Sequence, residues 1–104
     1  GDQSALKKMK NEYEERKRIL VEGLNEVKGI SCVNPGGAMY VFPNITKTGM
    51  DSDTFSEYVL DKIGVGVLPG NNFGKNGEGY IRMCYATSQE DILLALSRLK
   101  NLFG

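Results

Sequence analysis

A long helical repeat at the start of the chain does most to limit the folds that it can adopt. Within residues 3–28, apolar residues recur mainly three or four positions apart, with Arg16 interrupting the series. They are Leu6, Met9, Tyr13, Leu20, Leu24 and Val27. This spacing predicts one face of an α-helix over residues 3–28, ending at Gly29. Because the stripe is longer than the core of a 104-residue chain needs, we expect its first turns to pack on something else or to project into solvent.

Glycine and proline divide the rest of the chain into short elements. Apolar runs predict strands over residues 30–33, 38–45, 65–70 and 80–86. A helix is expected over residues 53–63. A last helix is expected to begin at Thr87 and Glu90, which match a capping box. This order predicts an α+β fold, with a small antiparallel or mixed sheet of about four strands and helices packed on one side. We expect residues 1–104 to form a single domain, in which the N-terminal helix precedes a body over 30–104.

The composition excludes several classes of function. Lys+Arg and Asp+Glu number 13 each, so no basic excess points to nucleic acid. No apolar run approaches the roughly 18 residues of a membrane-spanning helix. The chain has no histidine and only two cysteines, Cys32 and Cys84. Histidine-based acid–base catalysis is therefore excluded, and no metal site is expected. Without secretory features, we expect a cytoplasmic protein in which both cysteines are free, buried thiols.

The predicted strand 80–86 raises the question of function. Ile81, Met83 and Tyr85 form an apolar row, and Arg82 lies on the opposite row. Burying a guanidinium without a partner is costly, so Arg82 must contact something. It could form a structural ion pair, stack on a tyrosine, or bind an anion, because its planar fork matches a carboxylate.

Two other interpretations are weaker. The three glycines after Gly70 suggest a phosphate-binding loop, but their spacing does not fit and residues 71–79 lead into a strand rather than a helix. A surface loop is the simpler interpretation. Aromatic residues on the predicted strands, such as Tyr40 and Tyr80, suggest an RNA-binding sheet, but the chain lacks the surplus of basic residues that such a surface needs.

Three segments together point to a known family. They are "PGGAMYVFPNI" (35–45), "GVGVLPGNNFGKNGEGYIRMCYA" (64–86) and "TSQEDILLALSRL" (87–99). The tandem of P-G-x-x-F-G, G-E-G-Y-I-R and a following Y-A-T-S is specific. The chain resembles, over almost all of its length, the C-terminal small domain of the fold-type I aminotransferases that depend on pyridoxal phosphate. It is most similar to the prokaryotic aspartate aminotransferase-like subgroup of classes I and II.

The resemblance implies a role for individual residues. Arg82 stands at the position of the arginine that binds the substrate α-carboxylate. The other residues implied are Gly37, Ala38 and Tyr40 on the substrate side of the pocket, and Asn71, Asn72 and Phe73 in the loop at the active-site entrance. None of these residues is a catalytic residue in itself.

The resemblance also implies what lies outside this sequence. The full-length enzyme would use pyridoxal phosphate, held by a Schiff-base lysine of the large domain, and no segment of that kind occurs here. We therefore expect the chain alone to bind no cofactor and to be inactive as a transaminase. Its implied partners are the large pyridoxal-phosphate-binding domain of the same polypeptide, an amino acid or 2-oxo acid substrate, and a second subunit of a homodimer. Residues 3–28 would be the helix that connects the two domains.

Two alternatives remain open from the residues alone. The chain could be a free-standing module that binds a small ligand, with Arg82 reading its carboxylate. It could also be a protein-interaction module that uses the long first helix.

Overall fold

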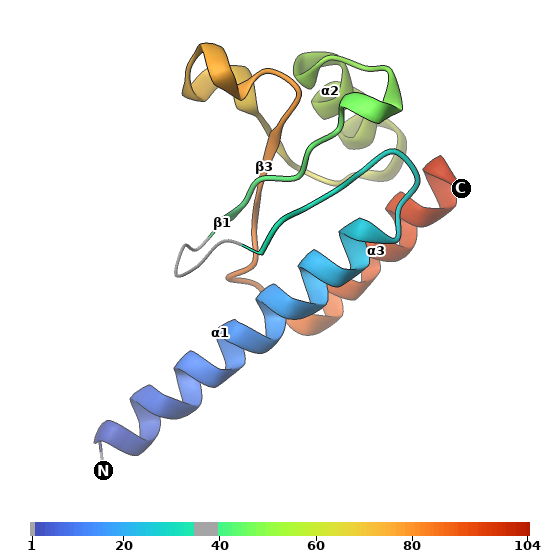
Figure 1. Cartoon of the computed structure of the whole chain (residues 1–104). Helices are drawn as coiled ribbons and strands as arrows, with labels where there is room; N and C mark the ends of the chain where they lie inside the picture. The colour runs from blue at the N-terminus through green and yellow to red at the C-terminus, as the bar shows by residue number, and fades with distance from the viewer. Residues whose placement is uncertain (1, 35–39) are drawn as a thin grey trace.

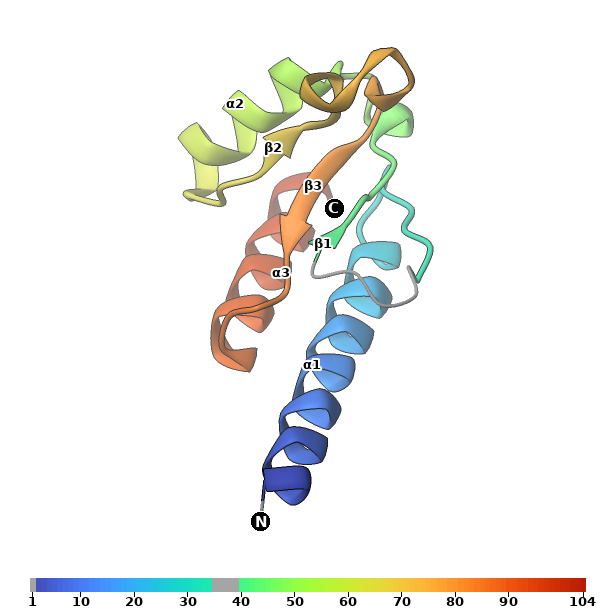
Figure 2. The same cartoon turned by 90° about the vertical axis from the view of Figure 1, so that its left-hand side faces the viewer.

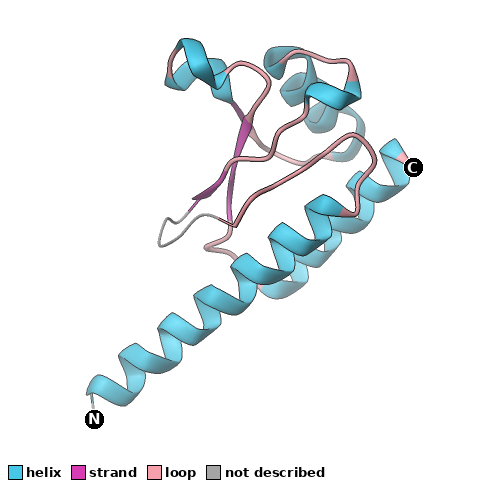
Figure 3. Ribbon diagram, viewed as in Figure 1, coloured by secondary structure: helices cyan, strands magenta, loops and turns pink. Residues whose placement is uncertain are grey.

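The computed structural model describes residues 2–34 and 40–104, and this part of the chain forms an α+β fold (Figure 1). The long helices are α1 (Asp2–Asn25), α2 (Ser52–Ile63) and α3 (Gln89–Phe103). The strands are β1 (Tyr40–Val41), β2 (Leu68–Pro69) and β3 (Ile81–Cys84). Short 3-10 helices are η1 (Thr46–Thr48), η2 (Gly70–Phe73) and η3 (Lys75–Gly77). Figure 3 separates the helical elements from the small sheet by colour.

The sheet is antiparallel and has the order β1-β3-β2, so β3 is its central strand. Tyr40 pairs with Cys84 on one side of β3, and Leu68 pairs with Arg82 on the other. Three strands form in the described residues, rather than about four. Residues 30–33, expected as a strand, contribute only one isolated bridge, from Ser31 to Asn44.

The missing strand has a local cause. The side chain of Asn25 holds the backbone of Cys32 from both sides, since its Oδ1 accepts from the Cys32 N–H and its Nδ2 donates to the Cys32 carbonyl, each at 2.8 Å. These backbone groups are therefore not available to a ladder. The expected strand 38–45 ends at Val41 rather than 45, in part because Pro43 has no N–H to donate, and residues 38 and 39 lie outside the described residues.

All three helices pack on one face of the sheet, as expected. The inward row of β3 and the residue after it, Ile81, Met83 and Tyr85, is buried. The same core takes residues from α1, α2 and α3, namely Leu20, Leu24, Phe55, Val59, Ile92, Leu96 and Leu99. The other row of β3 therefore faces away from the core. Cys84 lies on that row and is exposed, so the expectation that both free cysteines are buried is wrong for Cys84 and right for Cys32.

Helix α1 packs through its C-terminal half only. It runs beside α3 there, and its first turns project beyond the rest of the molecule (Figure 2). Leu20 and Leu24 are fully buried, whereas Leu6 is 63% and Met9 50% exposed. A Cβ on Gly23 would lie 2.3 Å from Leu96 Cδ1, so the glycine allows α1 and α3 to approach closely. No helix within residues 2–34 and 40–104 has the length and apolar character to span a membrane.

The helix ends follow the expected signals with two shifts. Asp51 accepts a hydrogen bond from the Thr54 N–H at 2.7 Å at the start of α2, and Gly64 closes that helix with a φ of 68°. The predicted capping box of α3 is one residue too early, because the cap is Ser88, whose Oγ accepts from the Asp91 N–H. Helix α1 ends at Asn25 rather than 28, since the chain tightens into turns before Gly29.

Candidate functional site

Arg82 lies on the face of the sheet that the helices leave uncovered, where two aromatic rings hold its guanidinium. Its Cζ is 4.3 Å from the centre of the Tyr40 ring and 4.6 Å from the centre of the Phe73 ring. No aspartate or glutamate among the described residues forms an ion pair with it. Of the structural interpretations of Arg82, stacking on a tyrosine is therefore the one that the structure shows.

The sheet register brings Tyr40 to this face. Tyr40 pairs directly with Cys84, and side chains of paired residues lie on the same face of a sheet. Arg82 is two residues from Cys84, so Tyr40 stands diagonally across from it. Continuing the same register to the Asn44–Tyr80 bridge places Phe42 directly opposite Arg82.

Phe73 reaches Arg82 from η2, which follows β2 on the other side of the central strand. The backbones of Gly70 and Gly77 touch there. A Cβ on Gly77 would lie 1.9 Å from the Gly70 carbonyl oxygen, so no larger residue fits. The Gly70 N–H also donates to the Tyr80 carbonyl at 2.7 Å. The expected surface loop 71–79 is thus folded into two 3-10 turns that carry Phe73 over the sheet.

The acidic side chains of this region bond to other groups. Glu78 accepts from the Ser52 N–H at 2.9 Å and from the Gly79 N–H. These hydrogen bonds, first that of Ser52 and then that of Gly79, lower the pKa of Glu78. Asp53 accepts from Asn71 Nδ2 at 2.9 Å. Their carboxylates therefore hold the loop to the start of α2, and neither of them forms an ion pair with Arg82.

Arg82 opens to a pocket of about 310 Å³. The pocket is lined by Tyr40, Gly66, Val67, Leu68, Arg82 and Cys84. The polar side-chain groups that line the pocket are the guanidinium of Arg82, the phenol of Tyr40 and the thiol of Cys84. This arrangement can take an anion at the guanidinium and an apolar group beside it.

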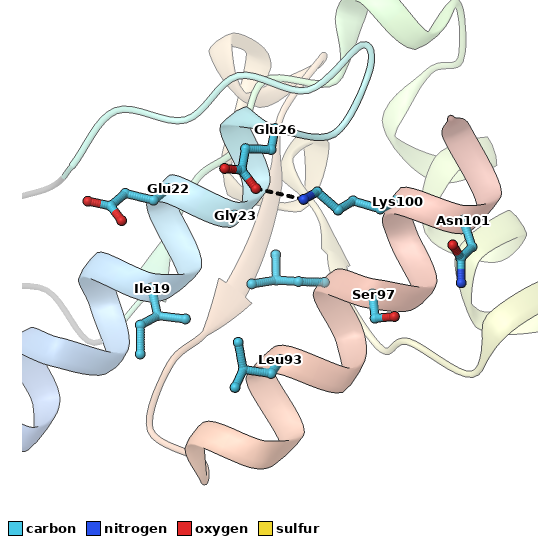
Figure 4. Close-up of a pocket in the computed structure, with 9 residues that line it drawn as sticks. Ile19, Glu22, Gly23, Glu26, Leu93, Ser97, Lys100 and Asn101 are labelled. Carbon is cyan, nitrogen blue, oxygen red and sulfur yellow. Dashed lines mark hydrogen bonds and ion pairs between the residues drawn. The ribbon is translucent and has the colours of Figure 1, made fainter.

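A second pocket, of about 460 Å³, lies between α1 and α3 (Figure 4). Its charged rim includes Glu26 and Lys100, which pair with each other at 2.7 Å between Oε2 and Nζ. Because the ammonium group of Lys100 is already paired with the carboxylate of Glu26, this groove is less suited to binding an anionic ligand than the pocket at Arg82.

Comparison with known proteins decides the family. The family model for aminotransferase class I and II matches residues 1–99. The chain belongs to the class I and II aminotransferases. The match falls on the C-terminal part of these enzymes.

Several relatives show how close this aminotransferase chain is to known enzymes. An aspartate aminotransferase of Pyrococcus horikoshii is 50% identical over 96 residues, which are 92% of this chain and 25% of that protein. An LL-diaminopimelate aminotransferase of Moorella thermoacetica is 38% identical over 100% of this chain and 26% of its own length. The crystal structure of an aromatic aminotransferase from Pyrococcus horikoshii superposes with a TM-score of 0.90 and 42% identity, over 95% of this chain and 26% of that one. The chain thus spans about a quarter of the length of these relatives.

The structure brings together some of the predicted site residues of this aminotransferase chain. Tyr40 and Phe73 meet at Arg82, whereas Asn71 bonds to Asp53 and Asn72 is exposed on η2. Gly37 and Ala38 lie outside the described residues. Sequence reasoning missed the Gly66–Leu68 wall of the pocket, which depends on the pairing of Leu68 with Arg82 across the sheet.

Proposed function

We propose that this chain is the small domain, residues 1–104, of a pyridoxal-phosphate-dependent amino-acid aminotransferase of the aspartate aminotransferase-like kind. In this proposal Arg82 binds the α-carboxylate of the substrate. The observation that supports this proposal is the environment of the Arg82 guanidinium. It is half-buried, it lies against two aromatic rings and it opens to a pocket, and it has no carboxylate partner among the described residues.

The geometry of the guanidinium supports binding of a carboxylate. An aromatic ring attracts the face of this planar group, while its N–H donors lie in the plane. The contacts with Tyr40 and Phe73 use none of those donors as a hydrogen bond, so the donors would be available to two carboxylate oxygens. A bound α-carboxylate would fix the orientation of the substrate Cα, which is catalysis by positioning.

The described residues around Arg82 do not fit the cofactor itself. Pyridoxal phosphate, when bound in such enzymes, stabilises the negative charge that develops at the substrate Cα. None of the described residues that line the pocket at Arg82 is a lysine, and Lys100 is paired with Glu26 on the far groove. We place the cofactor in the remaining three quarters of the full-length polypeptide, which would form a cytoplasmic homodimer.

Helix α1 would connect this domain to the large, cofactor-binding domain. The exposed apolar stripe of α1, formed by Leu6, Met9 and Tyr13, supports this placement. Such a stripe is typical of a surface that a partner covers, and the described residues do not cover it.

Replacing Arg82 by lysine in the full-length enzyme tests the proposal. Lysine keeps the charge but loses the two-pronged geometry. Losing one charge-assisted hydrogen bond costs roughly 1.5–3 kcal/mol, and the remaining hydrogen bond would also be misaligned. We therefore expect kcat/KM to fall about 10- to 1000-fold for every amino acid and 2-oxo acid, because all carry the same carboxylate. The melting temperature should stay near that of the wild type.

Arg98→Lys is the matched control. Arg98 is exposed on α3 and donates to the Ile63 carbonyl at 3.1 Å, so the same replacement there should leave kcat/KM unchanged. A stable, cofactor-loaded Arg82→Lys enzyme with wild-type kinetics toward two unrelated amino acids would overturn the carboxylate assignment. Loss of thermal stability with normal kinetics would show a purely structural role.

A further inference from the structure

We infer that Phe73 is a positioning residue, which sets the plane of the Arg82 guanidinium and depends for its own place on the contact between Gly70 and Gly77. The inference rests on the proposed function, because it concerns how Arg82 presents its donors to a carboxylate. It adds a residue whose effect would pass through Arg82 rather than through a contact of its own with the carboxylate.

Phe73 contacts Arg82 and Phe42 although it is half exposed. Its side chain is 46% exposed, so it contributes little to the core. Its ring nevertheless lies 4.6 Å from the Arg82 Cζ and meets the Phe42 ring edge-on, at 6.3 Å between centres and 87° between planes. Phe42, itself 44% exposed, lies opposite Arg82 in the sheet register. Phe73 is thus fixed from one side by Phe42 and contacts Arg82.

Arg82 needs such contacts to keep one orientation. An arginine side chain loses much rotamer freedom when it is ordered. Among the described residues the contacts that hold the Arg82 guanidinium are the rings of Tyr40 and Phe73, and no ion pair adds to them. Tyr40 is set by strand pairing. Phe73 is set by a loop, so the angle of the guanidinium depends on the geometry of that loop.

The loop geometry is determined by backbone contacts that side chains would break. A Cβ on Gly70 would lie 2.2 Å from the Gly77 carbonyl oxygen and 2.5 Å from that of Tyr80. The Tyr80 N–H donates in turn to the Gly77 carbonyl at 3.1 Å. Directly after Phe73, Gly74 has a φ of 121°, which a side chain strongly disfavours. The contact of Gly70 with Gly77 therefore fixes the position of η2, and η2 in turn fixes the position of the Phe73 ring. In this inference the ring then orients the guanidinium of Arg82.

The test compares Phe73→Leu with Phe73→Tyr in the full-length, cofactor-loaded enzyme, using two amino acids that the wild type accepts and one 2-oxo acid. Leucine keeps an apolar side chain of similar size but has no ring. We expect Phe73→Leu to raise KM by about 2- to 30-fold for all three substrates, the range of a lost cation–π contact. Phe73→Tyr keeps the ring and should lose much less. Leu60→Ala, at an exposed apolar position on α2, is the control for a general loss of surface packing.

A double-mutant cycle with Arg82→Lys shows whether Phe73 acts through Arg82. Lysine has no planar group to orient, so Phe73→Leu should add little in that background. The inference would be overturned if the fold-increases in KM of the two single variants multiplied fully in the double variant. It would also be overturned if Phe73→Leu and Phe73→Tyr raised KM equally, or if neither raised it. If Arg82→Lys alone has wild-type kinetics, the proposed function fails. If Arg82→Lys is impaired and Phe73→Leu is not, only the role of Phe73 fails.

Discussion

At the scale of single residues, Glu78 connects the loop 71–79, which carries Phe73, to helix α2. Its carboxylate accepts from the Ser52 N–H, at the positive end of the helix dipole, and from the Gly79 N–H. Both hydrogen bonds favour the ionised form, and the pKa of Glu78 is lowered from its ordinary value of 4.5. The ionised carboxylate therefore helps to hold the start of α2 against the end of the loop.

This predicts an acid-dependent loss of stability. Because the pKa of Glu78 is lower in the folded state, the unfolded state binds more protons between the two values, and stability falls as the pH falls through them. The contribution is complete above the unfolded pKa near 4.5 and is lost as the pH drops below the folded pKa. Thermal melts of wild type and Glu78→Gln should differ at about pH 7 and converge in acid.

Glu57→Gln is the matched control for this pH dependence, because Glu57 is exposed on α2. It should melt close to the wild type at neutral pH. A gap between wild type and Glu78→Gln that stays constant from neutral to acidic pH would contradict the assigned role of the Glu78 carboxylate.

The candidate site could be predicted in part. The alternation in strand 80–86 predicted that Arg82 lies opposite a buried apolar row, and this is confirmed, because alternation is a local property of a strand. The resemblance pointed to Tyr40 and Phe73, but not to their contact with the guanidinium. That contact depends on the pairing of Tyr40 with Cys84 and on a turn between Gly70 and Gly77, which bring together residues far apart in sequence.

At the scale of elements, periodicity predicted the helices better than the strands. The helix expected over 53–63 and the last helix are confirmed as α2 and α3, since caps and spacing act within a few residues. The strand expected over 30–33 is wrong, because the Asn25 side chain takes both backbone groups of Cys32. A run of four residues cannot reveal that its hydrogen bonds go to a side chain seven positions earlier.

Helix α1 should have two halves of different stability. Its buried residues Leu20 and Leu24 anchor one half, whereas Leu6 and Met9 contact little of the described chain. In the 104-residue chain, amide hydrogen exchange should be fast in the first turns and slow near Leu20. Association through the exposed stripe would slow it, so the measurement needs a preparation that sedimentation shows to be monomeric. Uniform strong protection of the whole helix in such a monomer would contradict this division.

At the scale of the whole molecule, we expect the 104-residue chain alone not to transaminate. The reason is that none of the described residues lining the Arg82 pocket is a lysine. Titration with pyridoxal phosphate, borohydride reduction and peptide mapping should give only slow, scattered labelling of surface lysines. One stoichiometric adduct at a single lysine would contradict the expectation. The same treatment of the full-length enzyme is the positive control.

The unequal packing of α1 has a mechanical consequence. A helix of 24 residues is a stiff rod about 36 Å long. It is held along its C-terminal half, where Leu20 and Leu24 are buried and Gly23 meets Leu96. If the domain and the packed half of the helix rotated together by about 10° about a point at Gly23, the first turn would move sideways by about 5 Å, given a rise of about 1.5 Å per residue. The helix would thus act as a lever, which converts a small rotation of the sheet and Arg82 into a larger displacement of any partner bound along its first turns.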